Sequence, residues 1–138
     1  MKTLTYALMM MAAFASADAS AKCFKFTDEK PTSIADMSFG GYAADRVCVY
    51  KINGFSGTHY SVRFSDAEGD IAALASQTEE VARCPGFCRE YDLTSGSILG
   101  KNVNPKGVRA KFQVERPTDG KLTFTYGRGV KTYRVAQE

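Results

Sequence analysis

The sequence Val108-Arg-Ala-Lys-Phe-Gln-Val-Glu-Arg-Pro-Thr-Asp-Gly-Lys-Leu-Thr-Phe-Thr-Tyr126 determines which fold class the chain can adopt. Apolar and polar residues alternate in its first and last parts, which predicts two β-strands with one buried face each. Pro117–Gly120 predicts the turn between them, because proline presets φ and glycine accepts a positive φ. Strands joined by so short a turn must be antiparallel, since a parallel return needs a long crossover.

The same alternation recurs on both sides of this hairpin. It predicts further strands, separated by turns rich in glycine, asparagine and aspartate, at Lys22–Thr27, Arg46–Ile52, Thr58–Phe64 and Val130–Val135. Ile71–Ser76 is an apolar run, and Gln77–Arg83 is expected to form a helical turn. About seven or eight short strands predict an all-β fold, either a small antiparallel barrel or a two-sheet sandwich.

Length and composition indicate one globular domain. The 138 residues are 44% hydrophobic and 12% aromatic, with a formal net charge of +3. Such a chain can bury a core and is not expected to be disordered. Collagen-like, coiled-coil and low-complexity classes are excluded by the same composition. We therefore expect a single all-β domain, stabilised by disulfides, over residues 22–138.

Residues 1–21 have the three parts of a secretory signal peptide. Lys2 supplies the positive charge, Leu4–Phe14 form an apolar core, and Ala19-Ser20-Ala21 matches an A-x-A cleavage site. The apolar core is too short to span a bilayer. We expect export to the periplasm or the extracellular space, with cleavage after Ala21 or, alternatively, after Ala17. The product should be soluble and should have no membrane span.

Four cysteines lie in the part of the chain that is expected to be exported: Cys23, Cys48, Cys84 and Cys88. An even number of cysteines in an oxidising compartment predicts two disulfides, with three possible connectivities. We expect Cys23–Cys48 to link two strands and Cys84–Cys88 to close a tight turn. The main alternative ties the Cys84–Cys88 loop to both N-terminal strands. A C-x-x-C redox site and a zinc site fit the spacing less well.

Charge is divided unevenly along the chain, with a net −3 over residues 22–100 and a net +6 over residues 101–138. The basic part predicts an anion-binding surface on the C-terminal strands. Its candidate residues are Arg109, Lys111, Lys121, Arg128, Lys131 and Arg134. The alternative is an ordinary solvated face whose cations protect the sheet from aggregation. Nucleic acid is not an expected partner, because an exported protein rarely meets it and the sequence contains no nucleic-acid-binding motif.

No pattern in the sequence predicts catalysis, a cofactor or a metal centre, and we expect that the protein is not an enzyme. His59 is the single histidine and has no nucleophile elbow nearby. Glu90 and Asp92 share one side of a strand and are the candidates for a glycosidase-like carboxylate pair. A calcium site would have to use three acids around a turn, which fall short of the D-x-[DN]-x-[DN]-G pattern: Asp66, Glu68 and Asp70.

Ser56-Gly57-Thr58-His59-Tyr60-Ser61 resembles the Ser-Gly-x-x-Tyr segment of bacterial periplasmic inhibitors of C-type lysozyme. The resemblance covers these six residues only and lacks the family's downstream tryptophan-containing segment. It implies a small disulfide-containing β-barrel that inhibits an enzyme, with Ser56, Gly57 and Tyr60 in the inhibitory turn. Lysozymes of that class are basic, so the net +6 of residues 101–138 would repel them.

Together these features predict a non-catalytic binding protein of the periplasm or the extracellular space. Its ligand would be an anionic envelope component or a protein, recognised through the basic C-terminal strands. The alternatives are a structural or adhesive component of the envelope and a periplasmic enzyme inhibitor.

Overall fold

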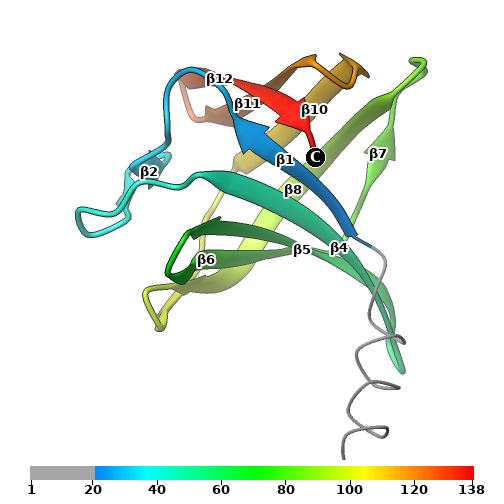
Figure 1. Cartoon of the computed structure of the whole chain (residues 1–138). Helices are drawn as coiled ribbons and strands as arrows, with labels where there is room; N and C mark the ends of the chain where they lie inside the picture. Colours follow the sequence, from blue (N-terminus) through cyan, green and yellow to red (C-terminus); the bar gives the residue numbers. More distant parts are fainter. Residues whose placement is uncertain (1–20) are drawn as a thin grey trace, which may run out of the picture.

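A computed structural model of the protein describes residues 21–138 (Figure 1). The signal peptide predicted for residues 1–21 lies, apart from Ala21, outside the described residues and stays a prediction. Twelve strands and no helix occur in the described part of the chain. The strands are β1 (Ala21–Phe26), β2 (Ser33–Ile34), β3 (Met37–Ser38), β4 (Arg46–Gly54), β5 (Gly57–Asp66), β6 (Gly69–Ser76), β7 (Glu80–Val81), β8 (Phe87–Ile98), β9 (Lys101–Val103), β10 (Val108–Arg116), β11 (Asp119–Tyr126) and β12 (Gly129–Gln137).

Eight of these strands form a closed ring of antiparallel pairs in the order β10-β11-β12-β1-β4-β5-β6-β8, with β8 returning to β10. β8 closes the ring because it is 12 residues long. Its first part, Phe87 to Leu93, pairs with β10, and its last part, Leu93 to Ile98, pairs with β6. The all-β prediction is confirmed. The ring is barrel-like without being a regular barrel.

The core lies inside the ring, where the alternation of the sequence places it. Every second residue from Val108 to Val114 is buried, and the residues between them are exposed. Aromatic rings fill the centre: the ring centroid of Phe24 lies 5.3 Å from those of Phe87 and Phe112. Such tilted contacts between aromatic rings add to the stability that comes from burying their apolar surface.

The helical turn expected over Gln77–Arg83 is wrong, because this segment contains β7. The two residues of β7 pair with Arg89 and Glu90 of β8. In this first part of β8, the edge that faces away from β10 lies beyond the reach of β6. β7 supplies partners for backbone groups on that edge, and this need outweighs the local preference of the sequence.

The two ends of the ring differ in structure. At one end the connection between β1 and β4, residues 27–45, folds across the opening and buries Ile34 and Phe39 completely. Its own backbone holds it in place, since the N–H of Phe39 donates to the carbonyl of Thr32 at 2.9 Å. We call this the capped end; it lies near β2 on the left of Figure 1. The opposite end, which includes the β4–β5 and β10–β11 turns, is the hairpin end.

Both expected disulfides are present, as Cys23–Cys48 and Cys84–Cys88. Cys23 and Cys48 are direct partners across β1 and β4, on the outer side of the ring. Cys84–Cys88 closes the turn that leads into β8. Since disulfides form and persist under oxidising conditions, they indicate an extracellular or periplasmic environment.

Candidate anion-binding face

The outer face of the ring presents one cation on each of six neighbouring strands. In ring order from β10 to β5 these are Lys111, Lys121, Arg134, Lys25, Arg46 and Arg63, here called the cationic band. Their side chains point outward because each follows or precedes a buried core residue in its strand: Phe112, Leu122, Val135, Phe24, Val47 and Phe64 respectively. Alternation along a strand thus places the six charges on one side of the sheet.

The strand register makes this band continuous. Lys121 is the direct partner of Arg134, and Lys25 is the direct partner of Arg46. Residues directly opposite each other have Cβ atoms about 4.5–5.5 Å apart. The remaining steps are diagonal, with an offset of two residues, and join Lys111 to Lys121, Arg134 to Lys25 and Arg46 to Arg63.

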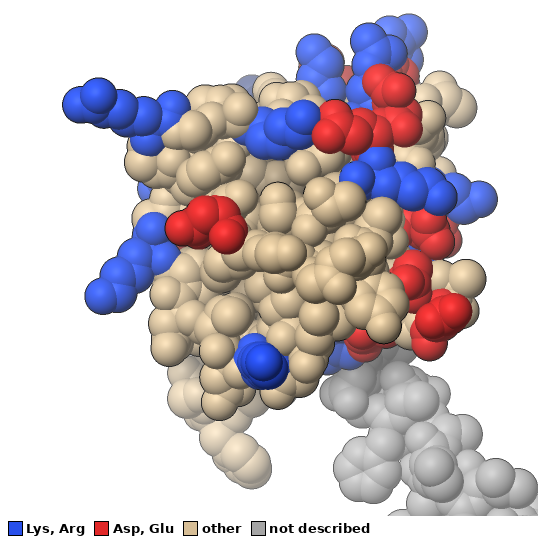
Figure 2. Space-filling model, turned by 90° about the vertical axis from the view of Figure 1, so that its left-hand side faces the viewer, with Lys and Arg blue, Asp and Glu red and all other residues tan. Residues whose placement is uncertain are grey.

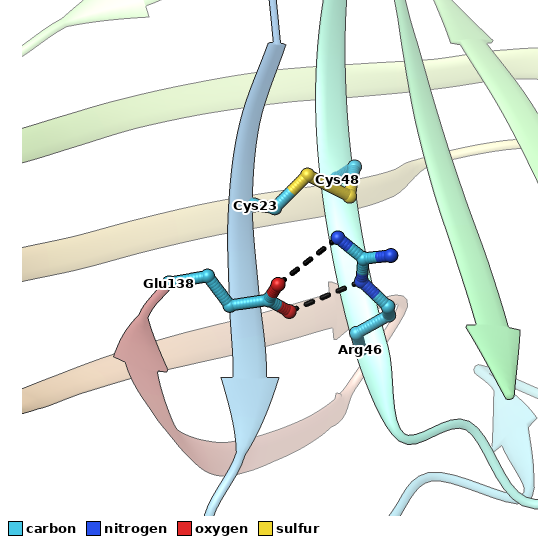
Figure 3. The surroundings of a disulfide bond; sticks show 4 residues. All are labelled: Cys23, Arg46, Cys48 and Glu138. Carbon is cyan, nitrogen blue, oxygen red and sulfur yellow. Dashed lines mark hydrogen bonds and ion pairs between the residues drawn. A yellow bond between two sulfur atoms is a disulfide. The ribbon is translucent and has the colours of Figure 1, made fainter. Parts of the chain in front are cut away.

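Within residues 21–138, Arg46 is the member of the band that forms an ion pair. Its Nε and Nη2 donate to the two carboxylate oxygens of Glu138, each at 3.0 Å. Figure 3 shows Glu138 reaching across β1 toward β4, beside the Cys23–Cys48 disulfide. The N–H of Glu138 also donates to the carbonyl of Cys23 at 3.0 Å. These contacts fasten the end of the chain to the middle of the band.

Arg109 lies on the same outer face as the band but opposite acids. It contacts Asp92 at 2.7 Å and Glu90 at 3.3 Å, both on β8. These carboxylates, Asp92 first, raise the pKa of Arg109. Two acids therefore compensate its charge, and it does not extend the band beyond Lys111.

Lys131 and Arg128 lie at the capped end, away from the band. Lys131 Nζ donates to Glu29 at 2.9 Å, and this hydrogen bond raises the pKa of Lys131. Arg128 lies in the turn between β11 and β12. Of the six cations predicted from the sequence, the structure brings together Lys111, Lys121 and Arg134.

Sequence reasoning missed Lys25, Arg46 and Arg63 as members of the band. Each of them lies in a strand that the sequence predicts, next to an apolar residue of the buried face. The alternation of apolar and polar residues therefore indicated that these three side chains point outward. The order of strands around the ring, which places β1 between β12 and β4, was not readable from the sequence.

The capped end offers a different kind of surface. In Figure 2, which views this end, the charged side chains lie mainly around the margin and the centre is uncharged. A groove of about 590 Å³ lies here, between the β2–β3 hairpin and the loop before β10, with Met37, Pro105 and Tyr126 among its lining residues. Its lining includes one cation, Lys106, and one acid, Asp36. The groove at the capped end therefore carries no net charge.

The residues considered for catalysis are spread over the surface. Glu90 and Asp92 are both ion-paired with Arg109, and their side chains remain 26% and 46% exposed. A general acid instead needs an apolar pocket that raises its pKa. His59 is the direct partner of Ile52 near the tip of the β4–β5 hairpin. That the protein is not an enzyme stays a prediction.

A group of polar side chains lies inside the ring at the hairpin end. The buried Tyr91 donates its hydroxyl to Glu79 at 2.5 Å, and Glu79 lies 3.7 Å from Arg89. Burial, followed by the hydrogen bond to Glu79, raises the pKa of Tyr91. Tyr60 packs beside it, with 5.4 Å between the two ring centroids. The hydrogen bond ties the segment before β7 to β8.

The acids considered for calcium surround the turn between β5 and β6. Oδ1 of Asp66 accepts the N–H groups of Glu68 at 2.9 Å and of Gly69 at 3.2 Å. This carboxylate therefore stabilises the turn, while Asp70 lies in β6. Among residues 21–138 no group of three acids, histidines or cysteines is placed to hold a metal ion.

The segment that resembles lysozyme inhibitors is divided between the surface and the interior. Ser56 and Gly57 lie at the tip of the β4–β5 hairpin and are exposed. Tyr60 lies farther along β5, where its ring contacts Tyr91 inside the ring of strands. The exposed tip is therefore the part of this segment that can meet a partner.

The described part of the chain includes no helix with the length and apolarity needed to cross a membrane. Comparison of the chain with protein-family models, with curated proteins and with solved structures found no match.

Proposed function

We propose that the protein is a non-catalytic binding protein of the periplasm or the extracellular space, and that it binds an anionic component of the cell envelope on its cationic band. The observation that supports this proposal is the band itself, in which five of the six cations have no ion-pair partner among residues 21–138. Strands linked into a closed ring fix the backbone positions from which these side chains project, so the backbone loses little conformational entropy on binding.

A ligand with repeated negative charges fits the band best. Neighbouring strands are about 4.8 Å apart, so a band across six of the eight strands follows the curved outer face of the ring for on the order of 24 Å. A single phosphate would contact two cations at most, whereas an acidic polymer or a phosphorylated glycolipid would contact several. The hydroxyl groups of Thr123 and Thr132, 3.1 Å apart between Lys111 and Arg134, offer further hydrogen bonds to phosphate oxygens.

Long-chain polyphosphate is a direct probe of this proposal. We expect saturable binding that weakens as the salt concentration rises, because exposed charges are screened. Arg134→Gln removes an unpaired cation of the band and should lower the affinity by about tenfold. Arg109→Gln is the matched control, because Asp92 and Glu90 already compensate that charge. It should change the affinity by less than about twofold.

Equal losses in the two variants would mean that net charge, and not the band, governs binding. An affinity that does not depend on salt would also contradict the proposal, as would the absence of any binding at low salt. Thermal unfolding of both variants checks that each has kept the fold.

A further inference from the structure

Phe55 stands at the tip of the β4–β5 hairpin with an exposed fraction of 115%. Strand pairing continues to Gly54 opposite Gly57, so Phe55 and Ser56 alone form the loop. Figure 1 shows this hairpin projecting at the hairpin end, away from β2. The phenyl ring contributes nothing to the core of the protein, and its whole apolar surface is available to a partner.

The tip is held in one shape before any partner arrives. Oγ1 of Thr58 donates to Oδ1 of Asn53 at 2.9 Å, across the last pairs of the two strands. Together with the Gly54–Gly57 pair, this bond fixes the base of the loop. A preorganised tip loses less entropy on binding than a flexible one.

The hairpin is also free of acidic side chains. Residues 46–65 include Arg46, Lys51 and Arg63 and contain no Asp or Glu. Lys51 lies four residues from Phe55, which is about 13 Å along the strand. The exposed Lys22 of the adjacent β1 lies at the same end of the ring, as the direct partner of Val49.

The exposed acids toward this end belong to other strands or are paired: Glu80 lies in β7, and Glu138 is ion-paired with Arg46. Glu115 and Asp119 belong to β10 and β11. β10 is four strands away from β4 in either direction around the ring. The tip therefore combines one protruding aromatic side chain with nearby positive charge and no nearby exposed acid on its own strands.

We infer that this tip docks the protein on an anionic lipid bilayer, with Phe55 at the boundary between headgroups and acyl chains and with Lys51 and Lys22 among the phosphates. An apolar group flanked by cations is the combination that binds the interface of anionic membranes. A bilayer accepts a single ring without a preformed pocket, which suits a tip with one apolar residue. The inference rests on the proposed function, which supplies the preference for anionic envelope components. It adds that a lipid bilayer is the source of the negative charge.

Sedimentation with vesicles tests the inference. The wild type should bind vesicles of equimolar phosphatidylglycerol and phosphatidylcholine more strongly than vesicles of phosphatidylcholine alone. Phe55→Ala should lower that binding by about tenfold, the lower end of what burial of a phenyl ring contributes. Val130→Ala is the matched control, because Val130 is 67% exposed and lies at the capped end, and it should bind as the wild type does. Wild-type protein that binds neither vesicle, or equal binding by Phe55→Ala and the wild type, overturns the inference.

A second variant reports the position of the tip directly. The chain has no tryptophan, so Phe55→Trp places a single indole at the tip. Its emission should shift to the blue on vesicle binding and should be quenched by lipids brominated along their acyl chains. Unchanged emission in bound protein overturns the inference.

Polyphosphate separates the two proposals. Phe55→Ala should bind polyphosphate as the wild type does, because Phe55 is not part of the cationic band. If Phe55→Ala keeps vesicle binding while Arg134→Gln loses both ligands, the inference about the tip is wrong and the proposed function stands. If the tip inserts but polyphosphate does not bind at low salt, the proposed function is wrong and the docking of the tip stands.

Discussion

The two ends of the ring are closed by different physical means. At the capped end, the connection between β1 and β4 buries Ile34 and Phe39, so apolar burial closes the ring. At the hairpin end, Tyr91, Glu79 and Arg89 add a chain of polar contacts inside the ring, beside the buried Phe87. Apolar closure depends on volume and shape, whereas a buried polar group is costly as soon as one partner is missing. The two ends should therefore respond differently to substitution and to pH.

Removing volume at the capped end should have the largest effect. The ring of Phe39 has no exposed surface and lies 5.7 Å from that of Phe64, centroid to centroid. We expect Phe39→Ala to lower the free energy of unfolding by about 3–5 kcal/mol, as measured by urea denaturation. Tyr42→Ala is the control, because Tyr42 lies in the same connection but is 46% exposed. A loss below about 1 kcal/mol in Phe39→Ala would show that the connection is a loose cover and not part of the core.

Removal of the Cys23–Cys48 disulfide should destabilise the protein more than removal of the Cys84–Cys88 disulfide. Cys23–Cys48 closes a loop of sequence separation 25 that includes the whole capping connection, whereas Cys84–Cys88, before β8, spans a separation of 4. By loop entropy, replacing Cys23 and Cys48 with serine should cost about 3 kcal/mol, and replacing Cys84 and Cys88 should cost about 2 kcal/mol. Guanidinium denaturation of both double variants measures the difference. The reverse order would mean that the turn before β8, and not the capping connection, limits stability.

The part of the fold that could be predicted is the part governed by local alternation. Alternation predicted the strands around Val108–Tyr126 and placed Cys23 and Cys48 in two strands, so a disulfide between these strands could be expected. The capping connection has no such period. Ile34 and Phe39 are buried only because they lie over the end of a ring built from the whole chain.

The candidate site divides in the same way. Lys121 and Arg134 could be predicted to be neighbours, because one tight turn joins their strands. Their proximity to Lys25 depends on β1 pairing with β12 near the other end of the chain, which no local pattern specifies. The compensation of Arg109 by Asp92 and Glu90 likewise requires β8 to pair with β10.

The polar closure of the hairpin end should show the smallest effect at neutral pH. Tyr91→Phe removes the hydroxyl that donates to Glu79 and leaves the ring in place. We expect a loss of about 1–2 kcal/mol in the free energy of unfolding at pH 7, measured by urea denaturation. Tyr50→Phe is the control, because no hydrogen bond of the Tyr50 hydroxyl occurs among residues 21–138 and this variant should match the wild type.

Alkaline pH distinguishes this polar closure from simple packing. Burial and Glu79 raise the pKa of Tyr91 above the ordinary value of 10.0, so the folded protein keeps a proton that the unfolded chain releases. The stabilisation is therefore complete below pH 10 and is lost as the pH rises toward the folded-state pKa. The loss amounts to as much as about 1.4 kcal/mol per pH unit for one such group.

The free energy of unfolding of Tyr91→Phe should still fall with pH, but less steeply, because burial also raises the pKa values of Tyr60 and Tyr133. The stability curves of the wild type and Tyr91→Phe should thus converge above pH 10, because only the wild type loses the contribution of residue 91. Parallel curves would mean that the Tyr91 hydroxyl does not keep its proton in the folded state above pH 10, and that burial and Glu79 do not raise its pKa.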